Sequence, residues 1–238
     1  VMAYAIQAFD KARDDEGHPY GGRYFAAPTG ADITRMIDSE REWTARKDAD
    51  LDGYWPREEL QFAYMTHQAN FALPEQGYTH WYKMFNSRQL LIHSTLLKTV
   101  ATSTSESSVR HQALGAIQQY LRMQNMFVFW HITYDKISPT LSNPNFHPKN
   151  NIVENNVFGP MGYGTWLSCA ETVIEALEWC KEPKELAIAQ AESSAKTMKV
   201  QVADPVLPGA LLHFGSSSDV PFTKTFDLVI TDPPFGDN

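Results

Sequence analysis

A short acidic motif near the end of the sequence carries residue types that can recognise an amino group. Asp232-Pro233-Pro234-Phe235 follows the apolar, β-branched run 226–231, which predicts a buried strand. The Asp232 carboxylate and the Pro233 carbonyl can each accept a hydrogen bond from the exocyclic amino group of adenine or cytosine. The two prolines fix φ and hold both acceptors in place, and the Phe235 ring offers a face for stacking the base.

This arrangement suits the transfer of a methyl group to nitrogen. The amino lone pair is delocalised into the ring of the base, so the nitrogen must be aimed at an electrophilic methyl group before it reacts. Open α/β sheets bind their ligands at the carboxyl ends of strands, where this motif is expected to lie. The alternative is a rigid turn that only ends a strand, and the apolar run before it favours the functional interpretation.

Residues 228–235 resemble the catalytic motif of DNA methyltransferases that modify exocyclic amino groups with S-adenosylmethionine. Two earlier blocks, 22–29 and 84–91, are similar to segments of large bacterial adenine-specific DNA methylases of the zinc-ribbon type. The resemblance implies double-stranded DNA as partner, adenine rather than cytosine as target, and a link to restriction-modification. The residues implied to hold the target base are Asp232, Pro233, Pro234 and Phe235.

Two features of that family are missing ahead of Asp232. The sequence has neither a Phe-x-Gly-x-Gly block, which receives the methionine end of the cofactor, nor a Cys-x-x-Cys pair for a zinc ribbon. From these gaps, and from the ends at Val1 and Asn238, we expect a fragment of a longer methyltransferase that is inactive alone. S-adenosylmethionine is then the cofactor of the parent enzyme.

Two loops are candidates for contact with that cofactor. The first follows a predicted strand at 210–214, near the cofactor's adenine in similar methyltransferases, and a plain surface loop is its alternative. Its candidate residues are Gly215, Ser216 and Asp219. The second is the glycine-rich stretch 159–164, but residues 155–157 make a poor buried strand and Pro160 removes a backbone donor, which favours a loop with a helix cap.

The candidates for DNA binding are Arg88, Lys149, Asn155 and Asn156. Arg88 begins a predicted helix, where it can bind a backbone phosphate or pair with a carboxylate such as Glu75. The other three belong to an Asn/Pro/Gly-rich loop at 136–164, whose side chains suit base edges and phosphates or, equally, Asx turns. The eight histidines show no ligand spacing, so no metal site is predicted.

The composition excludes several classes of protein. With 238 residues, of which 43% are hydrophobic and 20% charged, the chain can bury a core. A net charge of -8 argues against a uniformly basic nucleic-acid wrapper but allows a local basic strip. Two cysteines cannot build a disulfide framework, and no apolar run approaches the ~20 residues of a membrane span. A cytoplasmic globular protein is expected.

The predicted fold is mainly helical at 1–199, with a partial Rossmann-like methyltransferase sheet at 200–238. Helices are expected over 32–48, 88–102, 109–134, 165–180 and 183–199, and mainly loop over 1–30, 50–82 and 136–164. An open sheet edge would allow self-association or pairing with other subunits of a defence system. A helical DNA- or partner-binding module without catalysis is the second hypothesis. Methylation of RNA or of a protein glutamine is less favoured, because those enzymes usually begin this motif with Asn.

Overall fold

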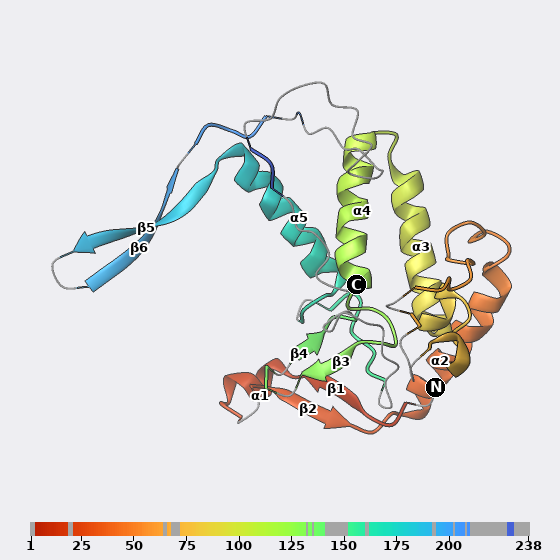
Figure 1. Cartoon of the computed structure of the whole chain (residues 1–238). Coiled ribbons are helices and arrows are strands. Elements are labelled where there is room, and N and C mark those ends of the chain that lie inside the picture. Colours follow the sequence, from red (N-terminus) through yellow and green to blue (C-terminus); the bar gives the residue numbers. More distant parts are fainter. Residues whose placement is uncertain are drawn as a thin grey trace. The chain divides into compact units, whose positions relative to one another are not determined.

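Helices form most of the regular structure in the computed structural model (Figure 1). The structure describes residues 3–18, 21–63, 66–67, 72–131, 133–134, 136–140, 152–159, 162–191, 194–201, 203–207, 209 and 228–230. The chain divides into two compact units, Val1–Ser168 and Cys169–Asn238, and the boundary falls inside a helix. Because helices make up most of the described regular structure, the expectation of a mainly helical chain is confirmed.

The described elements follow one another as β1 (Ile6–Phe9), α1 (Lys11–Asp15), β2 (Arg23–Ala26), α2 (Gly30–Arg46), the 3-10 turns η1 (Pro74–Gln76) and η2 (Trp81–Met84), α3 (Ser87–Ser103), α4 (Ser107–Leu121), β3 (Phe129–His131), β4 (Lys136–Ser138), α5 (Trp166–Lys181), β5 (Lys184–Ala191) and β6 (Ser194–Gln201). The described sheets are three antiparallel ribbons, which pair β1 with β2, β3 with β4, and β5 with β6. A parallel methyltransferase sheet is not among them.

Reciprocal side-chain caps define where the two longest helices begin. At α2, the Asp32 backbone N–H donates to Thr29 Oγ1 and the Thr29 N–H donates back to the Asp32 carboxylate. At α3, Asn86 and Gln89 exchange the same pair of bonds at 2.9 and 3.0 Å. Each cap satisfies two backbone groups that a helix end leaves free. The predicted helices 32–48 and 88–102 are confirmed with their starts shifted by one or two residues.

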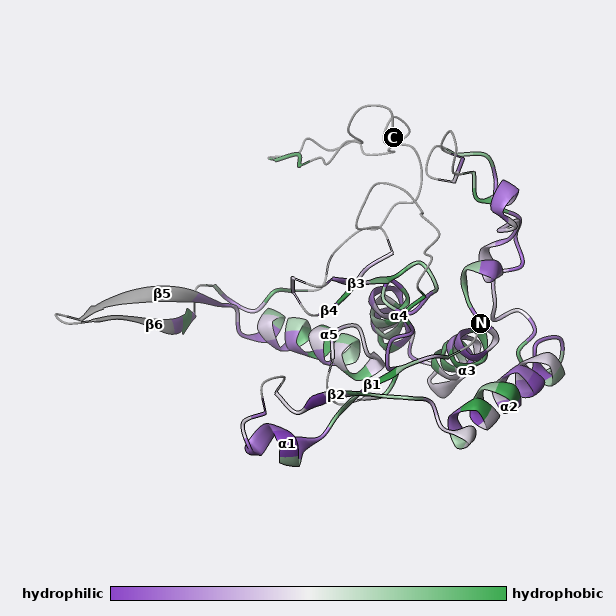
Figure 2. Ribbon diagram, turned by 90° about the horizontal axis from the view of Figure 1, so that it is seen from below, coloured by the Kyte–Doolittle hydropathy of each residue, from purple (hydrophilic) through white to green (hydrophobic). Residues whose placement is uncertain are grey.

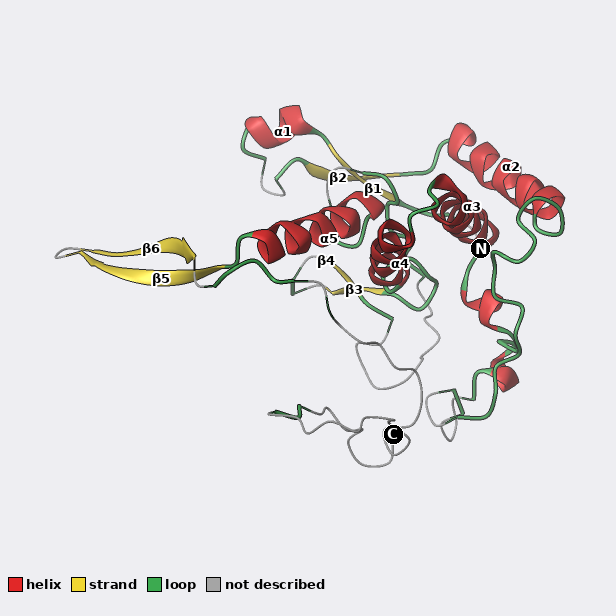
Figure 3. Cartoon of the chain, turned by 90° about the horizontal axis from the view of Figure 1, so that it is seen from above, coloured by secondary structure: helices red, strands yellow, loops and turns green. Residues whose placement is uncertain are grey.

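Helices α3 and α4 pack side by side in the first unit, and α2 lies against α3 (Figures 1 and 3). Both α2 and α5 carry hydrophobic residues interspersed with hydrophilic ones (Figure 2), and some of these apolar side chains are exposed, such as Ile37 of α2 and Ile174 of α5. Trp43 of α2 packs with Leu51 and Leu90, so this cluster joins α2, the loop after it and α3. A second cluster around Phe127 joins η2 to the segment after α4.

The helix predicted over 109–134 is wrong beyond its first half, because α4 ends at Leu121. The Asn125 side chain explains this: its Nδ2 donates to the Leu121 carbonyl and its Oδ1 accepts from the Phe127 N–H. The first bond satisfies a carbonyl at the helix end, the second fixes the backbone of the turn after it, and the chain continues into β3. Apolar residues continue at helical spacing through Phe129, although Phe129 belongs to β3. Periodicity alone therefore predicts a helix that extends too far.

The helix predicted over 183–199 is also wrong, because β5 and β6 form an antiparallel hairpin there. The register pairs Lys184 with Gln201 and Ile188 with Thr197. Lys, Glu, Ala and Leu favour helix only weakly, and the bonds between two strands of eight residues each override that preference. Residues 1–30, predicted as irregular, contain β1, α1 and β2.

The segment between α2 and α3 is largely irregular, as predicted, with η1 and η2 as short helical turns within it (Figure 3). The helix predicted over 165–180 is confirmed as α5. The strand predicted at 210–214 lies outside the described residues.

Replacement of the α3 cap residue should cost more than replacement of the α2 cap residue. Asn86→Ala removes both the cap and a hydrogen bond to Glu154, so we expect a loss of about 2 kcal/mol in the free energy of unfolding. Thr29→Ala removes an exposed cap alone and should cost less. Urea unfolding followed by circular dichroism compares the two variants. An equal or smaller loss for Asn86→Ala would contradict this account of α3.

Candidate functional site

All seven of the predicted catalytic and cofactor-binding residues fall outside the described part of the chain. They are Gly215, Ser216, Asp219, Asp232, Pro233, Pro234 and Phe235. Lys149, a predicted DNA contact, is likewise outside it. Of the strand predicted before the motif, Leu228, Val229 and Ile230 are described, outside any strand and 73%, 70% and 85% exposed. These three adjacent apolar side chains are therefore uncovered.

Arg88 is half-buried and holds a carboxylate far away in the sequence. Its Nε donates to Glu154 Oε1 at 2.7 Å, and its Nη2 donates to Glu154 Oε2 at 2.6 Å. Asn86 Nδ2 donates to the same carboxylate at 3.1 Å. The hydrogen bonds with Glu154 raise the pKa of Arg88 above its usual value. Of the two roles open to Arg88 from sequence, pairing with a carboxylate is observed, with Glu154 and not Glu75 as the partner.

Asn155 and Asn156 shape the backbone of their own loop. Asn156 Oδ1 accepts from the N–H groups of Phe158 and Gly159, which is an Asx turn, and Asn155 Nδ2 donates to the Tyr163 carbonyl. A Cβ on Gly159 would lie 2.2 Å from the Asn156 amide nitrogen, so a larger residue there would displace the Asn156 side chain. These bonds match the structural alternative for the two asparagines.

Gln124 fixes that loop against the helices through a fully buried amide. Its Nε2 donates to the carbonyls of Asn156 and Gly164, both at 2.9 Å, while its backbone carbonyl accepts from His93 Nε2 at 2.8 Å. The carbonyl can only accept, so Nε2 carries the His93 proton and Nδ1 accepts from the Tyr120 hydroxyl at 3.0 Å. Burial lowers the pKa of His93 to about 4.

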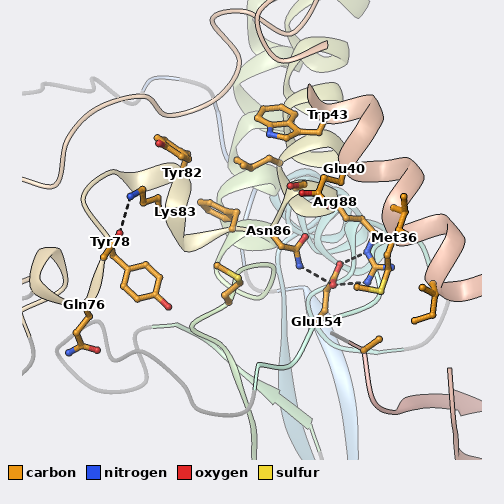
Figure 4. Close-up of a pocket in the computed structure, with 18 residues that line it drawn as sticks. Met36, Glu40, Trp43, Gln76, Tyr78, Tyr82, Lys83, Asn86, Arg88 and Glu154 are labelled. Carbon is orange, nitrogen blue, oxygen red and sulfur yellow. Dashed lines mark hydrogen bonds and ion pairs between the residues drawn. The ribbon is translucent and has the colours of Figure 1, made fainter. Parts of the chain in front are cut away.

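A cavity of about 660 Å³ opens beside the Arg88–Glu154 pair (Figure 4). Residues of α2, of the η1–η2 segment and of the first turn of α3 line it, together with Glu154. Its aromatic lining residues are Trp43, Tyr78, Tyr82 and Phe85, and its charged ones are Glu40, Lys83, Arg88 and Glu154. Of the lining residues, only Arg88 was a predicted site residue, because the lining comes from five stretches that are separated in the sequence.

Residues 48–59 match the Asp-x-Asp-x-Asp-Gly-x5-Glu spacing of a calcium loop, a pattern that our sequence analysis missed. The carboxylates are paired with cations of the chain itself. Asp48 and Asp52 both accept from Arg57 Nη2, at 2.8 and 2.6 Å, and Asp50 accepts from Lys98 Nζ at 2.9 Å. No group of three potential metal ligands was found in the described part of the chain. The pattern therefore forms an ion-pair network.

No protein-family model, curated protein or solved structure matched this chain. Across the described residues, no helix combines the length and the apolar character needed to cross a bilayer.

The buried His93 makes stability depend on pH. Its pKa is about 4 in the folded chain and 6.5 in its unperturbed form, so the unfolded state binds more protons between these values. The contribution of neutral His93 to the free energy of unfolding is complete above pH 6.5. About 3 kcal/mol of that contribution is lost as the pH falls to 4. Urea unfolding at a series of pH values measures this slope.

The matched variants for this test are His93→Gln and His111→Gln. His93→Gln should flatten the pH dependence between 4 and 6.5, whereas replacement of the exposed His111 should leave it unchanged. A slope that persists in folded His93→Gln would assign the effect to other groups.

Proposed function

We propose that this chain is part of an S-adenosylmethionine-dependent DNA methyltransferase that modifies an exocyclic amino group, adenine in preference to cytosine. The observation that carries the proposal is the sequence 228–235, an apolar run that leads into Asp-Pro-Pro-Phe. The parent enzyme acts on double-stranded DNA in the cytoplasm, within a restriction-modification or related defence system.

In this proposal the motif prepares the base for reaction. Asp232 accepts one amino hydrogen and the Pro233 carbonyl accepts the other, which orients the nitrogen lone pair. Phe235 stacks on a base flipped out of the duplex. The cofactor, when bound to the parent enzyme, supplies the methyl group.

The exposed residues 228–230 support an assignment to a larger sheet. Leu, Val and Ile in succession are typical of a parallel strand covered on both faces, yet all three are at least 70% exposed. Further strands of a Rossmann-like sheet would cover them. An uncovered apolar run of this kind also favours association with another copy of the chain.

The described part of the loop 152–164 is not arranged as a cofactor-binding loop. Within 152–164, the carbonyls of Asn156, Tyr163 and Gly164 already accept hydrogen bonds from side chains of the chain. Residues 155–157, which precede the glycine-rich stretch 159–164, are irregular and do not form a strand. We therefore propose that the cofactor is held mainly by other parts of the parent enzyme, with Gly215, Ser216 and Asp219 near its adenine.

Asp232→Ala tests the role of the motif in the enzyme that contains this chain. Loss of one preorganised polar contact to the reacting group should reduce methyl transfer to duplex DNA by about 100-fold or more. Asp232→Asn keeps one acceptor oxygen and should retain more activity than the alanine variant. Transfer of labelled methyl from S-adenosylmethionine to DNA measures both.

Asp204→Ala is the matched control, since Asp204 is an exposed acid upstream of the motif. It should retain full activity, and all variants should keep the melting temperature of the unmodified enzyme. Undiminished methyl transfer by Asp232→Ala would overturn the proposal and favour a DNA- or partner-binding module.

A further inference from the structure

The cavity in the first unit has rigid aromatic walls (Figure 4). Trp43 and Tyr82 both pack edge-on against Trp55, with ring centroids 5.4 Å apart in each pair. Tyr78 packs in the same manner against Phe127 at 5.0 Å. Neither Trp55 nor Phe127 lines the cavity, so each wall ring is supported from behind. Rings fixed in this way can receive a planar ligand with little loss of side-chain entropy.

Polar groups with spare hydrogen-bonding capacity lie among these rings. The hydrogen bonds described for Arg88 use Nε and Nη2, which leaves Nη1 available. Lys83 Nζ, at another wall of the cavity, donates to the Gly77 carbonyl at 3.0 Å and has two further protons. Glu154 Oε1 accepts one described bond and has a second lone pair. The cavity therefore offers both donors and acceptors.

The charges of the lining favour a neutral ligand over an ion. Arg88 pairs with Glu154 directly, and the two other charged lining residues, Lys83 and Glu40, carry opposite charges, so the formal charge of the lining is zero. A volume of about 660 Å³ falls within the roughly 300–1,000 Å³ of small-molecule sites. The ligand must then be planar, uncharged and equipped with donors and acceptors along its edge.

We propose that this cavity binds a nucleobase, as a free nucleoside or as a nucleotide unstacked from a DNA strand. The base stacks among the rings of Trp43, Tyr78 and Tyr82 and meets Arg88 and Glu154 with its polar edge. This site is separate from Asp232-Pro233-Pro234-Phe235 and does not depend on methyl transfer.

Titration calorimetry of the full chain tests the proposal, with adenosine, cytidine and a short single-stranded DNA as probes. At least one of the three should bind with a dissociation constant below about 1 mM, while ribose, which lacks a base, should not bind. Tighter binding of the DNA identifies an unstacked nucleotide as the source, and tighter binding of a nucleoside identifies a free metabolite. Absence of binding by all three probes would overturn the proposal.

Two variants locate the binding in the cavity. Ile37 lines it and is 52% exposed, so Ile37→Arg can obstruct the cavity without removing core packing, and affinity should fall at least about tenfold. Thr34→Arg adds the same charge at an exposed position of α2 outside the lining and should change affinity less than about twofold.

Glu154→Gln is a second test of the cavity as the binding site, because it retains the shape of the side chain and removes the charged acceptor. It should weaken base binding in a chain whose melt is still cooperative. Binding that is unaffected by Ile37→Arg, in a folded variant, would place the ligand elsewhere and overturn the assignment. None of these measurements involves methylation. A negative result for base binding therefore does not affect the methyltransferase proposal, and loss of the methyltransferase proposal does not affect base binding.

Discussion

The ion pair between Arg88 and Glu154 joins two segments that are 66 residues apart and holds the start of α3 against the loop that contains Glu154. One carboxylate receives two bonds from Arg88 and one from Asn86, the residue that caps α3. Breaking the pair would leave a half-buried charge beside the helix start, where an unpaired partner is costly. The same pair forms one wall of the cavity, so the start of α3, the loop containing Glu154 and the candidate ligand site share one interaction.

Gln124 also fixes the loop that contains Glu154. Its amide holds the carbonyls of Asn156 and Gly164, and its backbone carbonyl fixes the tautomer of His93. A helix that continued past Leu121, as apolar spacing predicts, would change the position of Gln124. The irregular stretch after α4 therefore places the Gln124 amide against the loop and the Gln124 carbonyl within hydrogen-bonding distance of His93.

Local signals in the sequence predicted α2, α3 and α5, because their caps and apolar periodicity act within a few residues. The failures have two physical causes. Asn125 ends α4 through contacts that periodicity does not report, and the β5–β6 pairing overrides weak helix preferences. Arg88 was predicted to bind DNA, with pairing to a carboxylate such as Glu75 as the alternative, and spacing did not identify Glu154 as its partner. The calcium-loop spacing at 48–59 was not noticed in the sequence, and in the structure its carboxylates pair with Arg57 and Lys98.

The central claim is that a protein containing this chain methylates an exocyclic amino group of DNA. The most direct measurement is mass spectrometry of the nucleosides released from duplex DNA after incubation with that protein and S-adenosylmethionine. The account predicts methylation at the amino nitrogen of adenine, the group that Asp232 and the Pro233 carbonyl are suited to orient. Methyl groups found only on a ring carbon, or unmodified DNA from a folded protein that binds the cofactor, would contradict it.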